Sequence, residues 1–475
     1  MIINTQNLPP LSPHDELQTY CGLDCCLTME IGERVRQISP ESSIYNFSRG
    51  LQAPILDMML RGWRVNMNLR HHVTEEIDSK LSLFTERLND FALAVWGKGL
   101  NPNSPLQLKT FFYERMKLPQ QFIYDKGEKR LSTNEESLER LEPYIYARPF
   151  VTLIKEIRTL KKQRDFFTSA LDSDGRFRSS FNVAGTETGR LSSSKTAFGT
   201  GGNAQNIAPQ WRYILIADPG MEIVYIDLSQ VEARDVGFIC GCLFNRWELL
   251  NNCESGDLHT ANCKLIWPEI NWTGDPGKDR KIADREYLPG MSFRDLSKRA
   301  GHLTHYKGTP HTASKKLKIA FKVISDFNHR YLAAYDFLPN WWQWVTQEIQ
   351  TKGQLTTPFG RKRFFFNRLD NDSTIREAVA FMPQSMTGDR TNLWLWRVWK
   401  HVKEAQLLNQ THDSIAFQIP LGRRELVAQV VELMEIPLLS KSGRRYVVPG
   451  EVKIGLNYGE WSVSNPSGLR KVNLK

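Results

Sequence analysis

The sequence lacks the features that mark membrane-spanning and disulfide-rich secreted proteins. No apolar run approaches the length that crosses a bilayer. The N-terminus MIINTQNLPPLSPHDEL has neither a basic n-region nor an apolar h-region. The seven cysteines are odd in number and form no paired CxxC pattern, which disfavours both a disulfide framework and a structural zinc site. We therefore expect a reduced, soluble, cytoplasmic protein with no membrane partner.

The sequence also lacks internal repeats and low-complexity tracts. Its 475 residues are enough for two to four subdomains. Lys and Arg number 62 against 52 Asp and Glu, a formal charge of +10 that suits a polyanionic partner without proving one.

Helical periodicity dominates the first third of the chain. Residues 14–38, 54–62, 69–97 and 134–171 read as helices, with a short strand-like RVNMN after residue 62. The basic segment RTLKKQRDFF within this region fits a clamp over a duplex, or else an ordinary solvated helix face.

Short strands and a Gly- and Ser-rich loop follow, over residues 176–240. Residues 256–345 return to helix, and the polar stretch 267–292 reads as an inserted loop. Residues 346–475 mix helices and strands, and LLNQTHDSIAFQI predicts a β-hairpin.

Two aspartates stand at the tips of probable buried strands. Asp227 ends the apolar run of IVYIDLSQVEARD, and Asp413 precedes that of QTHDSIAFQIP. Adjacent strands would bring the two carboxylates together as a metal site, although either could instead be a capping residue. Between them, Arg294, Lys298 and His302 recur every four residues. Since four residues turn an α-helix by about 400°, these side chains share one face, which could hold phosphates or could simply be solvated.

Six segments in order resemble those of family A DNA polymerases of the polymerase I type, from about residue 14 to the C-terminus. They are TGRLSSS with QNIAP, IDLSQVEAR, RDLSKRAGHLTHYKG, REAVAFMPQS, QTHDS and VKIGLNYGEW. The FGTGG loop and the PQS arrangement look most like the bacteriophage branch.

The resemblance implies an α/β right-hand polymerase fold, with a helical thumb, a palm built on an antiparallel β-sheet and helical fingers. The implied domains are an exonuclease remnant at 1–40, the thumb with its entry helices at 41–175, the first part of the palm at 176–255, the fingers at 256–345 and the second part of the palm at 346–475.

The same resemblance implies template-directed addition of dNTPs to a primer 3′ end on primer–template DNA. Two Mg²⁺ ions, replaceable by Mn²⁺, would bind Asp227, Asp413 and the backbone carbonyl of Leu228. Glu232 resembles the residue that excludes a ribose 2′-hydroxyl, although a structural role is an alternative. Tyr306 would end the helix beside the template base and pair with Glu232.

Further residues match binding positions of the family. The expected nucleotide contacts are His259, Arg294, Lys298, His302, Tyr306 and Glu232. The expected DNA contacts are Arg190 and Gln384 in the minor groove, Arg376, Gln205 and Asn206 on the strand backbones, and His412 at the primer terminus. Each of these polar residues could instead have an ordinary role on the protein surface, without binding DNA.

Three positions depart from the family pattern. His302 stands where Phe or Tyr is usual, Ser414 replaces a Glu after the second aspartate, and Ala380 replaces an Asn. These changes leave the two-metal core intact, but they put sugar selectivity and fidelity in question.

Tyr20 and Asp24 resemble the last motif of a 3′–5′ exonuclease, whose other carboxylates are missing from this sequence. We therefore expect no autonomous proofreading, in a protein that is shortened, naturally short or one half of a split polymerase. A separate exonuclease chain or a replication accessory protein is a candidate partner. The stripe of Leu17, Leu23, Leu27 and Ile31 predicts that residues 14–38 pack on the polymerase body.

Two alternative functions stay open on the sequence. A single-subunit RNA polymerase would share the palm, but Glu232 disfavours it. A catalytically silent nucleic-acid-binding homologue is disfavoured because both Asp227 and Asp413 are present.

Overall fold

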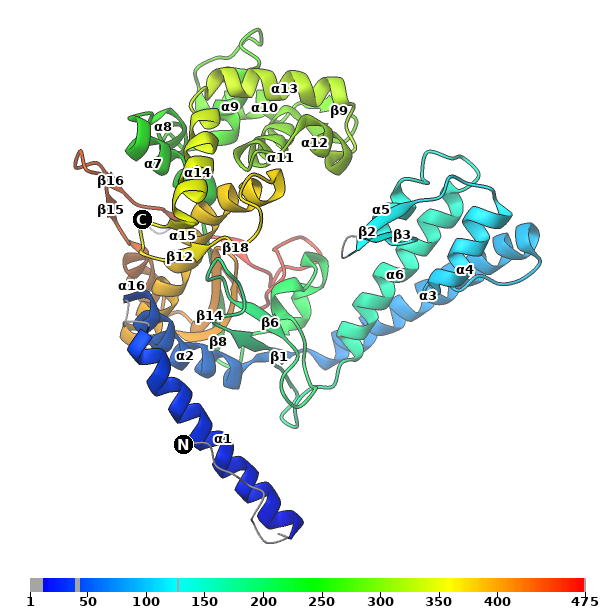
Figure 1. Ribbon diagram of the computed structural model, residues 1–475, viewed down its shortest axis with the longest axis horizontal. Coiled ribbons are helices and arrows are strands. Elements are labelled where there is room, and N and C mark those ends of the chain that lie inside the picture. The colour runs from blue at the N-terminus through cyan, green and yellow to red at the C-terminus, as the bar shows by residue number, and fades with distance from the viewer. Residues whose placement is uncertain (1–11, 39–42, 126–127, 474–475) are drawn as a thin grey trace.

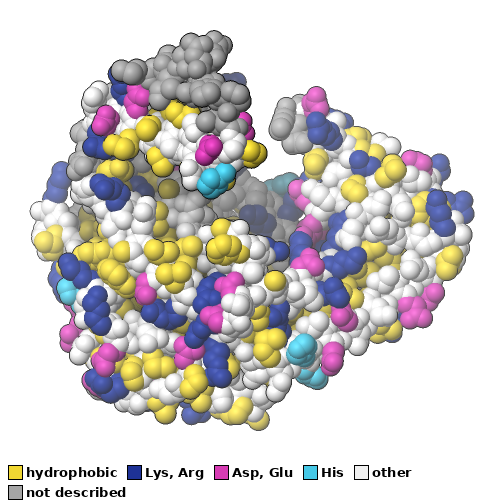
Figure 2. Space-filling view, turned by 90° about the horizontal axis from the view of Figure 1, so that it is seen from below, with side chains coloured by type: hydrophobic (Ala, Val, Ile, Leu, Met, Phe, Trp, Pro, Cys, Tyr) yellow, Lys and Arg dark blue, Asp and Glu magenta, His cyan; other side chains and the backbone are white. Residues whose placement is uncertain are grey.

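The computed structural model describes residues 12–38, 43–125 and 128–473. Figure 1 shows a central unit built on a β-sheet, a helical arm to one side, a block of helices above the sheet and one helix projecting below it. None of the described helices is both long enough and apolar enough to cross a bilayer. On the face seen from below, basic and acidic side chains are intermingled, so the net positive charge is not gathered there (Figure 2).

The central sheet has five antiparallel strands in the order β13-β14-β8-β17-β18. These are β13 (Gln406–Thr411), β14 (Ser414–Pro420), β8 (Met221–Leu228), β17 (Gly450–Gly455) and β18 (Arg470–Lys471). The apolar run before Asp227 forms the central strand β8, because Ile223, Val224 and Ile226 pack on both faces of the sheet. The predicted hairpin is confirmed as β13 and β14.

Helices cover one face of this sheet. The helices α2 (Ser43–Arg61) and α15 (Asp372–His401) pack on the sheet, α7 (Val231–Phe244) and α16 (Glu425–Met434) pack on α15, and α8 (Glu248–Glu254) packs on α7. A buried ion pair between Asp235 of α7 and Arg390 of α15, 3.0 Å long, joins the two helices that flank the sheet. The helix α2 begins at Ser43, well before the predicted start at Pro54. Leu51, one turn before Ile55, is also buried in the core, so the apolar face of the helix continues N-terminal to Pro54.

The helical arm consists mainly of α3 (Met67–Trp96) and α6 (Arg148–Thr168), which pack along each other. Its end is closed by α4 (Pro105–Lys109), the π-helical η2 (Thr110–Arg115), the hairpin β2 (Phe122–Asp125) and β3 (Glu128–Leu131), and α5 (Glu135–Glu139). The single helix expected over 134–171 is therefore two helices. The residues between α5 and α6 form turns, and Pro149 stands in the first turn of α6.

The upper block contains α9 (Leu258–Ile266), α11 (Phe293–His305), α12 (Pro310–Leu317), α13 (Phe321–Ala334) and α14 (Leu338–Lys352). The stretch 267–292 is not the plain loop that was expected. It contains α10 (Pro276–Ala283) and the hairpin β9 (Glu286–Leu288) and β10 (Met291–Ser292). The reason is Asp279, fully buried, whose carboxylate accepts hydrogen bonds from the backbone N–H groups of Thr273 and Gly274 and so orders the polar turn.

Short elements connect these units. They are β1 (Trp63–Val65), β4 (Arg176–Phe177), β5 (Ser180–Asn182), β6 (Ser192–Ser194), η3 (Ala204–Asn206), η4 (Pro209–Ile214), β7 (Leu215–Ile216), β11 (Gln354–Thr356), β12 (Lys362–Phe364), β15 (Leu438–Leu439) and β16 (Arg445–Tyr446).

The helix predicted near the N-terminus is confirmed as α1 (Pro13–Ile38), but its predicted packing is wrong. Leu17 is 61%, Leu27 54% and Ile31 61% exposed, and the helix projects away from the central unit (Figure 1). Helical periodicity identifies an apolar stripe, but it does not say whether the stripe has a partner.

Candidate functional site

Asp227 and Asp413 meet at one end of the central sheet, as their strand-tip positions predict. Asp227 is paired in register with Ser414 of β14, and Asp413 is the residue before Ser414 in the turn from β13. The N–H of Leu228 donates to the carbonyl of Asp413 at 3.0 Å, which locks the two strand ends together. Asp227, Leu228 and Asp413 all line a cavity of about 720 Å³.

The two carboxylates disfavour each other's charge. Burial and the charge of Asp413 raise the pKa of Asp227 to about 7, although the hydrogen bond from Tyr225 opposes the shift. Burial also raises the pKa of Asp413. Two adjacent, partly desolvated carboxylates are hard oxygen donors that a divalent cation would neutralise, so this donor set fits Mg²⁺. No group of three or more His, Cys, Asp or Glu side chains suited to a metal occurs in the described part of the chain. The carbonyl of Leu228 is the further protein oxygen at hand.

Glu232, in the first turn of α7, is held from three sides. Arg190 pairs with one of its carboxylate oxygens, and the hydroxyl of Tyr306 donates to the other. The Nε2 atom of His302 lies 3.8 Å from the same carboxylate. Burial alone would raise the pKa of Glu232, but Arg190 and the Tyr306 hydroxyl outweigh it and lower the pKa. The carboxylate is thus ionised and fixed at the wall of the cavity, and the predicted pairing of Tyr306 with Glu232 is confirmed.

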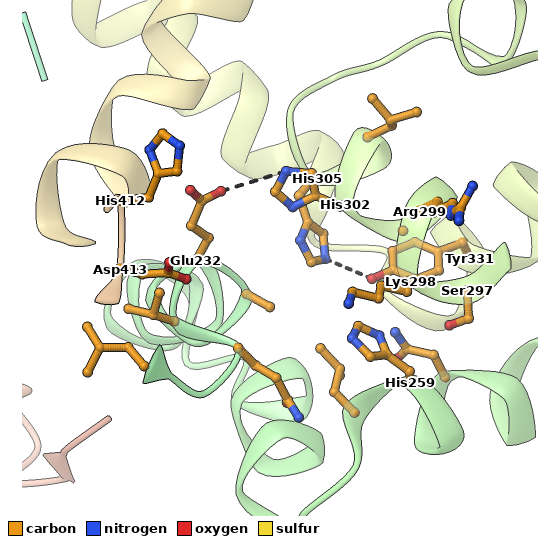
Figure 3. Close-up of a pocket in the computed structure, with 18 of the residues that line it drawn as sticks. Glu232, His259, Ser297, Lys298, Arg299, His302, His305, Tyr331, His412 and Asp413 are labelled. Atoms are coloured by element: carbon orange, nitrogen blue, oxygen red, sulfur yellow. Dashed lines mark hydrogen bonds and ion pairs between the residues drawn. The ribbon is translucent and has the colours of Figure 1, made fainter. Parts of the chain in front are cut away.

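The cationic face of α11 lies across the cavity from the aspartates. Ser292 and Asp295 form a capping box that starts the helix, so Lys298 and His302 fall on the side facing the cavity. Figure 3 shows Glu232, His412 and Asp413 on one side, with Lys298, His302 and His259 on the other. A polyanion between these walls would contact metal-binding carboxylates at one end and cations at the other.

Arg294 is placed differently from the other residues of this face. Its guanidinium binds Asp257 with two hydrogen bonds of 2.9 and 3.1 Å, and it does not line the cavity. Asp257 also caps α9 through the N–H of His259. Burial and the charge of Arg294 lower the pKa of His259 to about 4, so the imidazole is neutral near pH 7. Its buried Nδ1 has no hydrogen-bond partner among the described residues.

The remaining predicted DNA contacts surround this centre. His412 lines the cavity from the β13–β14 turn, where its φ of 53° turns the chain. Gln205 donates to the carbonyls of Leu191 and Gln410, which fixes its amide near the sheet edge. Neighbouring Asn206 is exposed. The other two residues are on α15: Arg376 pairs with Asp372, and Gln384 is half-buried.

Some residues of the site had no signal of their own in the sequence. Asp257 precedes a helix and reads only as a cap, whereas in three dimensions it also holds Arg294. Tyr225 reads as one more strand residue, yet its hydroxyl donates to Asp227 at 3.2 Å. His305 hydrogen-bonds with the Tyr331 hydroxyl at 2.7 Å behind α11 (Figure 3), which the spacing of α11 could not reveal.

Comparison with known proteins gives a consistent result. A family model described as DNA polymerase family A matches residues 71–461. The thermostable DNA polymerase I of Thermus filiformis is 28% identical over 429 residues, which are 86% of this chain and 47% of that protein. DNA polymerase I of Treponema pallidum is 23% identical over 439 residues, which are 88% of this chain and 41% of that protein. The chain therefore spans about half the length of the curated relatives it matches.

The fold has a counterpart among solved structures. It is the POL domain of Pol1 from M. smegmatis, solved in complex with DNA primer-template and dNTP. That structure superposes with a TM-score of 0.70 at 21% identity, over 86% of this chain and 69% of the other. The likeness shows the fold, and the predicted α/β right-hand architecture is confirmed.

Proposed function

Because the chain belongs to DNA polymerase family A, we propose that it is a template-directed DNA polymerase that adds dNTPs to the 3′ end of a DNA primer. The observation that carries this proposal is the cavity between the β8 and β14 strand ends and α11. It sets Asp227 and Asp413 opposite Lys298 and His302. Phosphoryl transfer requires carboxylates that bind metal ions and, opposite them, cations that bind phosphates.

Asp227, Asp413 and the carbonyl of Leu228 would hold two Mg²⁺ ions, with Mn²⁺ as a substitute. When bound, such ions activate the primer hydroxyl and neutralise charge on the leaving pyrophosphate. Lys298 supplies a cation toward the triphosphate, and the neutral imidazole of His259 lines the cavity beside it. Glu232, fixed by Arg190 and Tyr306, fills the space of a ribose 2′-hydroxyl and so selects deoxyribose.

The proposed domains follow from these roles. The thumb occupies 41–175, the palm 176–255 and 346–475, and the fingers 256–345. The proposed DNA contacts are Arg190 and Gln384 in the minor groove, Gln205, Asn206 and Arg376 on the backbones, and His412 at the primer terminus. Arg190 and His412 line the cavity, and the Gln205 amide is fixed at the sheet edge by the carbonyls of Leu191 and Gln410, which supports these three assignments.

Substitution of either aspartate tests the proposal. Asp227→Ala or Asp413→Ala should abolish primer extension while primer–template affinity stays nearly unchanged, because affinity comes from many phosphate contacts elsewhere. Gel-based extension with dNTPs and Mg²⁺, together with DNA binding by fluorescence anisotropy, gives both quantities. Glu451→Gln is the matched control, since Glu451 pairs with Asp227 in register but its carboxylate binds Lys471. Extension within tenfold of wild type in either aspartate variant would contradict the metal site.

Two finer proposals concern the setting. The FGTGG loop and the PQS segment support replication of the bacteriophage type, in the cytoplasm of a bacterial host. We also propose that Tyr20 and Asp24 do not form a working 3′–5′ exonuclease site, because Tyr20 is exposed on α1 and no metal-binding group of three or more His, Cys, Asp or Glu occurs in the described residues. A labelled single-stranded 3′ end should stay intact with the purified chain and Mg²⁺. Degradation that disappears in Asp24→Ala would overturn this second proposal.

A further inference from the structure

Tyr225 and Asp227 point to the same face of β8, because they lie two residues apart on one strand. The Tyr225 hydroxyl donates to Oδ1 of Asp227 at 3.2 Å. We propose that Tyr225 is a positioning residue, which holds the Asp227 carboxylate in the orientation that binds a divalent cation. This inference rests on the proposed function, since it assigns Asp227 to a metal site.

The position of the Tyr225 ring is itself well defined. Its register neighbours are the small Ala416 on β14 and Lys453 on β17, so one side of the ring has room and the other is flanked. The Tyr458 ring packs edge-on against it at 5.9 Å between centroids, and Tyr458 in turn packs at 4.7 Å against the buried Trp63. A ring held in this way can aim its hydroxyl at one point.

Asp227 has little else to orient its carboxylate. Its register neighbour on β14 is Ser414, whose hydroxyl donates to the carbonyl of Thr411. On β17 the neighbour is Glu451, whose carboxylate binds Lys471 at 2.6 Å. Within the described residues, Tyr225 is the only side chain whose hydrogen bond to the Asp227 carboxylate the structure shows. Loss of that bond would therefore leave the carboxylate free to rotate away from a bound cation.

Partners that orient a metal-binding side chain typically affect metal affinity or activity by about 10- to 100-fold. Tyr225→Phe keeps the ring and removes only the hydroxyl, so we expect Mn²⁺ to bind about tenfold more weakly. The measurement is Mn²⁺ titration of the DNA-free protein, followed by electron paramagnetic resonance, which needs no catalysis. In extension assays the Mg²⁺ concentration for half-maximal rate should rise, whereas KM for dNTP at saturating Mg²⁺ should not.

Tyr458→Phe is the matched control. Its ring belongs to the same aromatic cluster, and its hydroxyl is in hydrogen-bonding contact with Asn409 and Thr411 instead of Asp227. We expect wild-type Mn²⁺ affinity for this variant. The comparison therefore separates a packing defect of the aromatic cluster from loss of the Tyr225–Asp227 hydrogen bond. It does so even if both variants melt at a lower temperature than wild type.

Asp227→Ala separates failure of this inference from failure of the proposed function. If Asp227→Ala weakens Mn²⁺ binding but Tyr225→Phe does not, the positioning role is wrong and the metal site stands. Equal weakening in Tyr225→Phe and Tyr458→Phe also overturns the positioning role. If Asp227→Ala binds Mn²⁺ as well as wild type, the metal site itself is wrong and the inference falls with it.

Discussion

At the scale of single residues, the fixed carboxylate of Glu232 gives a sharp test of sugar selection. Glu232→Ala removes the group that fills the space of a 2′-hydroxyl and releases Arg190 and Tyr306 from their shared partner. Ribonucleotides should then be incorporated more efficiently, which lowers the ratio of dNTP to rNTP efficiency in single-turnover assays.

Tyr306→Phe is the control for this experiment. It keeps the Glu232 carboxylate and its ion pair with Arg190 but removes the Tyr306 hydroxyl. Most of the discrimination should survive. An unchanged ratio in Glu232→Ala, or an equal loss in both variants, would mean that the carboxylate is not the gate.

Lys298 and Arg294 were predicted to act alike, and the structure now separates them. Lys298→Ala removes an exposed cation from the cavity wall. It should reduce dNTP efficiency by roughly 10- to 150-fold, the equivalent of a charge-assisted phosphate contact of about 1.5–3 kcal/mol. Arg294→Ala should reduce it too, but it should also lower the melting temperature because Asp257 loses its partner.

Steady-state kinetics, DNA anisotropy and thermal melting distinguish the two variants. Lys315→Ala, which removes an exposed cation of α12 that does not line the cavity, is the matched control for general loss of charge. A Lys298→Ala defect that appears mainly as weaker DNA binding would show that this helix face serves the duplex and not the triphosphate.

At the scale of elements, α1 differs from every helix of the central unit because its apolar stripe is solvent-exposed. Leu27→Ala should therefore change the free energy of unfolding by no more than about 0.5 kcal/mol, as for other surface sites. The matched substitution is Ile55→Ala in α2, where the side chain is 2% exposed and the expected loss is about 2–5 kcal/mol. Urea unfolding monitored by tryptophan fluorescence measures both.

Equal losses for Leu27→Ala and Ile55→Ala would mean that α1 packs on the body of the protein in solution, as its amphipathic pattern suggested. The element scale also shows where the groups of the site stand. Asp227 is at the end of β8, Glu232 is in the first turn of α7, Lys298 and His302 are farther along α11, and Asp413 is in the β13–β14 turn.

At the scale of the whole molecule, the paired aspartates link stability to pH and to divalent cations. The pKa of Asp227 is about 7 in the folded protein and near 4 in an unfolded chain, so the folded state holds a proton that the unfolded state releases. Stability from this group is complete below about pH 4 and is lost as pH rises through 7. At pH 8 the Asp227 carboxylate of the folded protein is thus mostly ionised, beside Asp413.

A cation that neutralises this charge should stabilise the protein most where Asp227 is ionised. Addition of Mg²⁺ should therefore raise the melting temperature more at pH 8 than at pH 6, as measured by differential scanning fluorimetry. Asp227→Asn should abolish this pH difference and raise the metal-free melting temperature at pH 8. A Mg²⁺ effect of equal size at both pH values would show that the cation acts elsewhere.

The sequence by itself determined the parts that depend on local periodicity and order along the chain. An apolar run placed Asp227 at the end of β8, a spacing of four put Lys298 and His302 on one side of α11, and the order of six motifs identified the family. The first two features depend on residues close together in the chain, where backbone geometry fixes the arrangement, and the third depends only on order along the chain.

Only the tertiary structure decided which side chains have partners. It paired Arg294 with Asp257, aimed Tyr225 at Asp227 and left the apolar stripe of α1 without cover. Each of these outcomes depends on contacts between elements. The periodicity of one helix or strand does not predict which residues of another element will pack against it. Contacts of this kind also set the pKa of Asp227, because burial and the Asp413 charge arise only when β8 and β14 lie side by side.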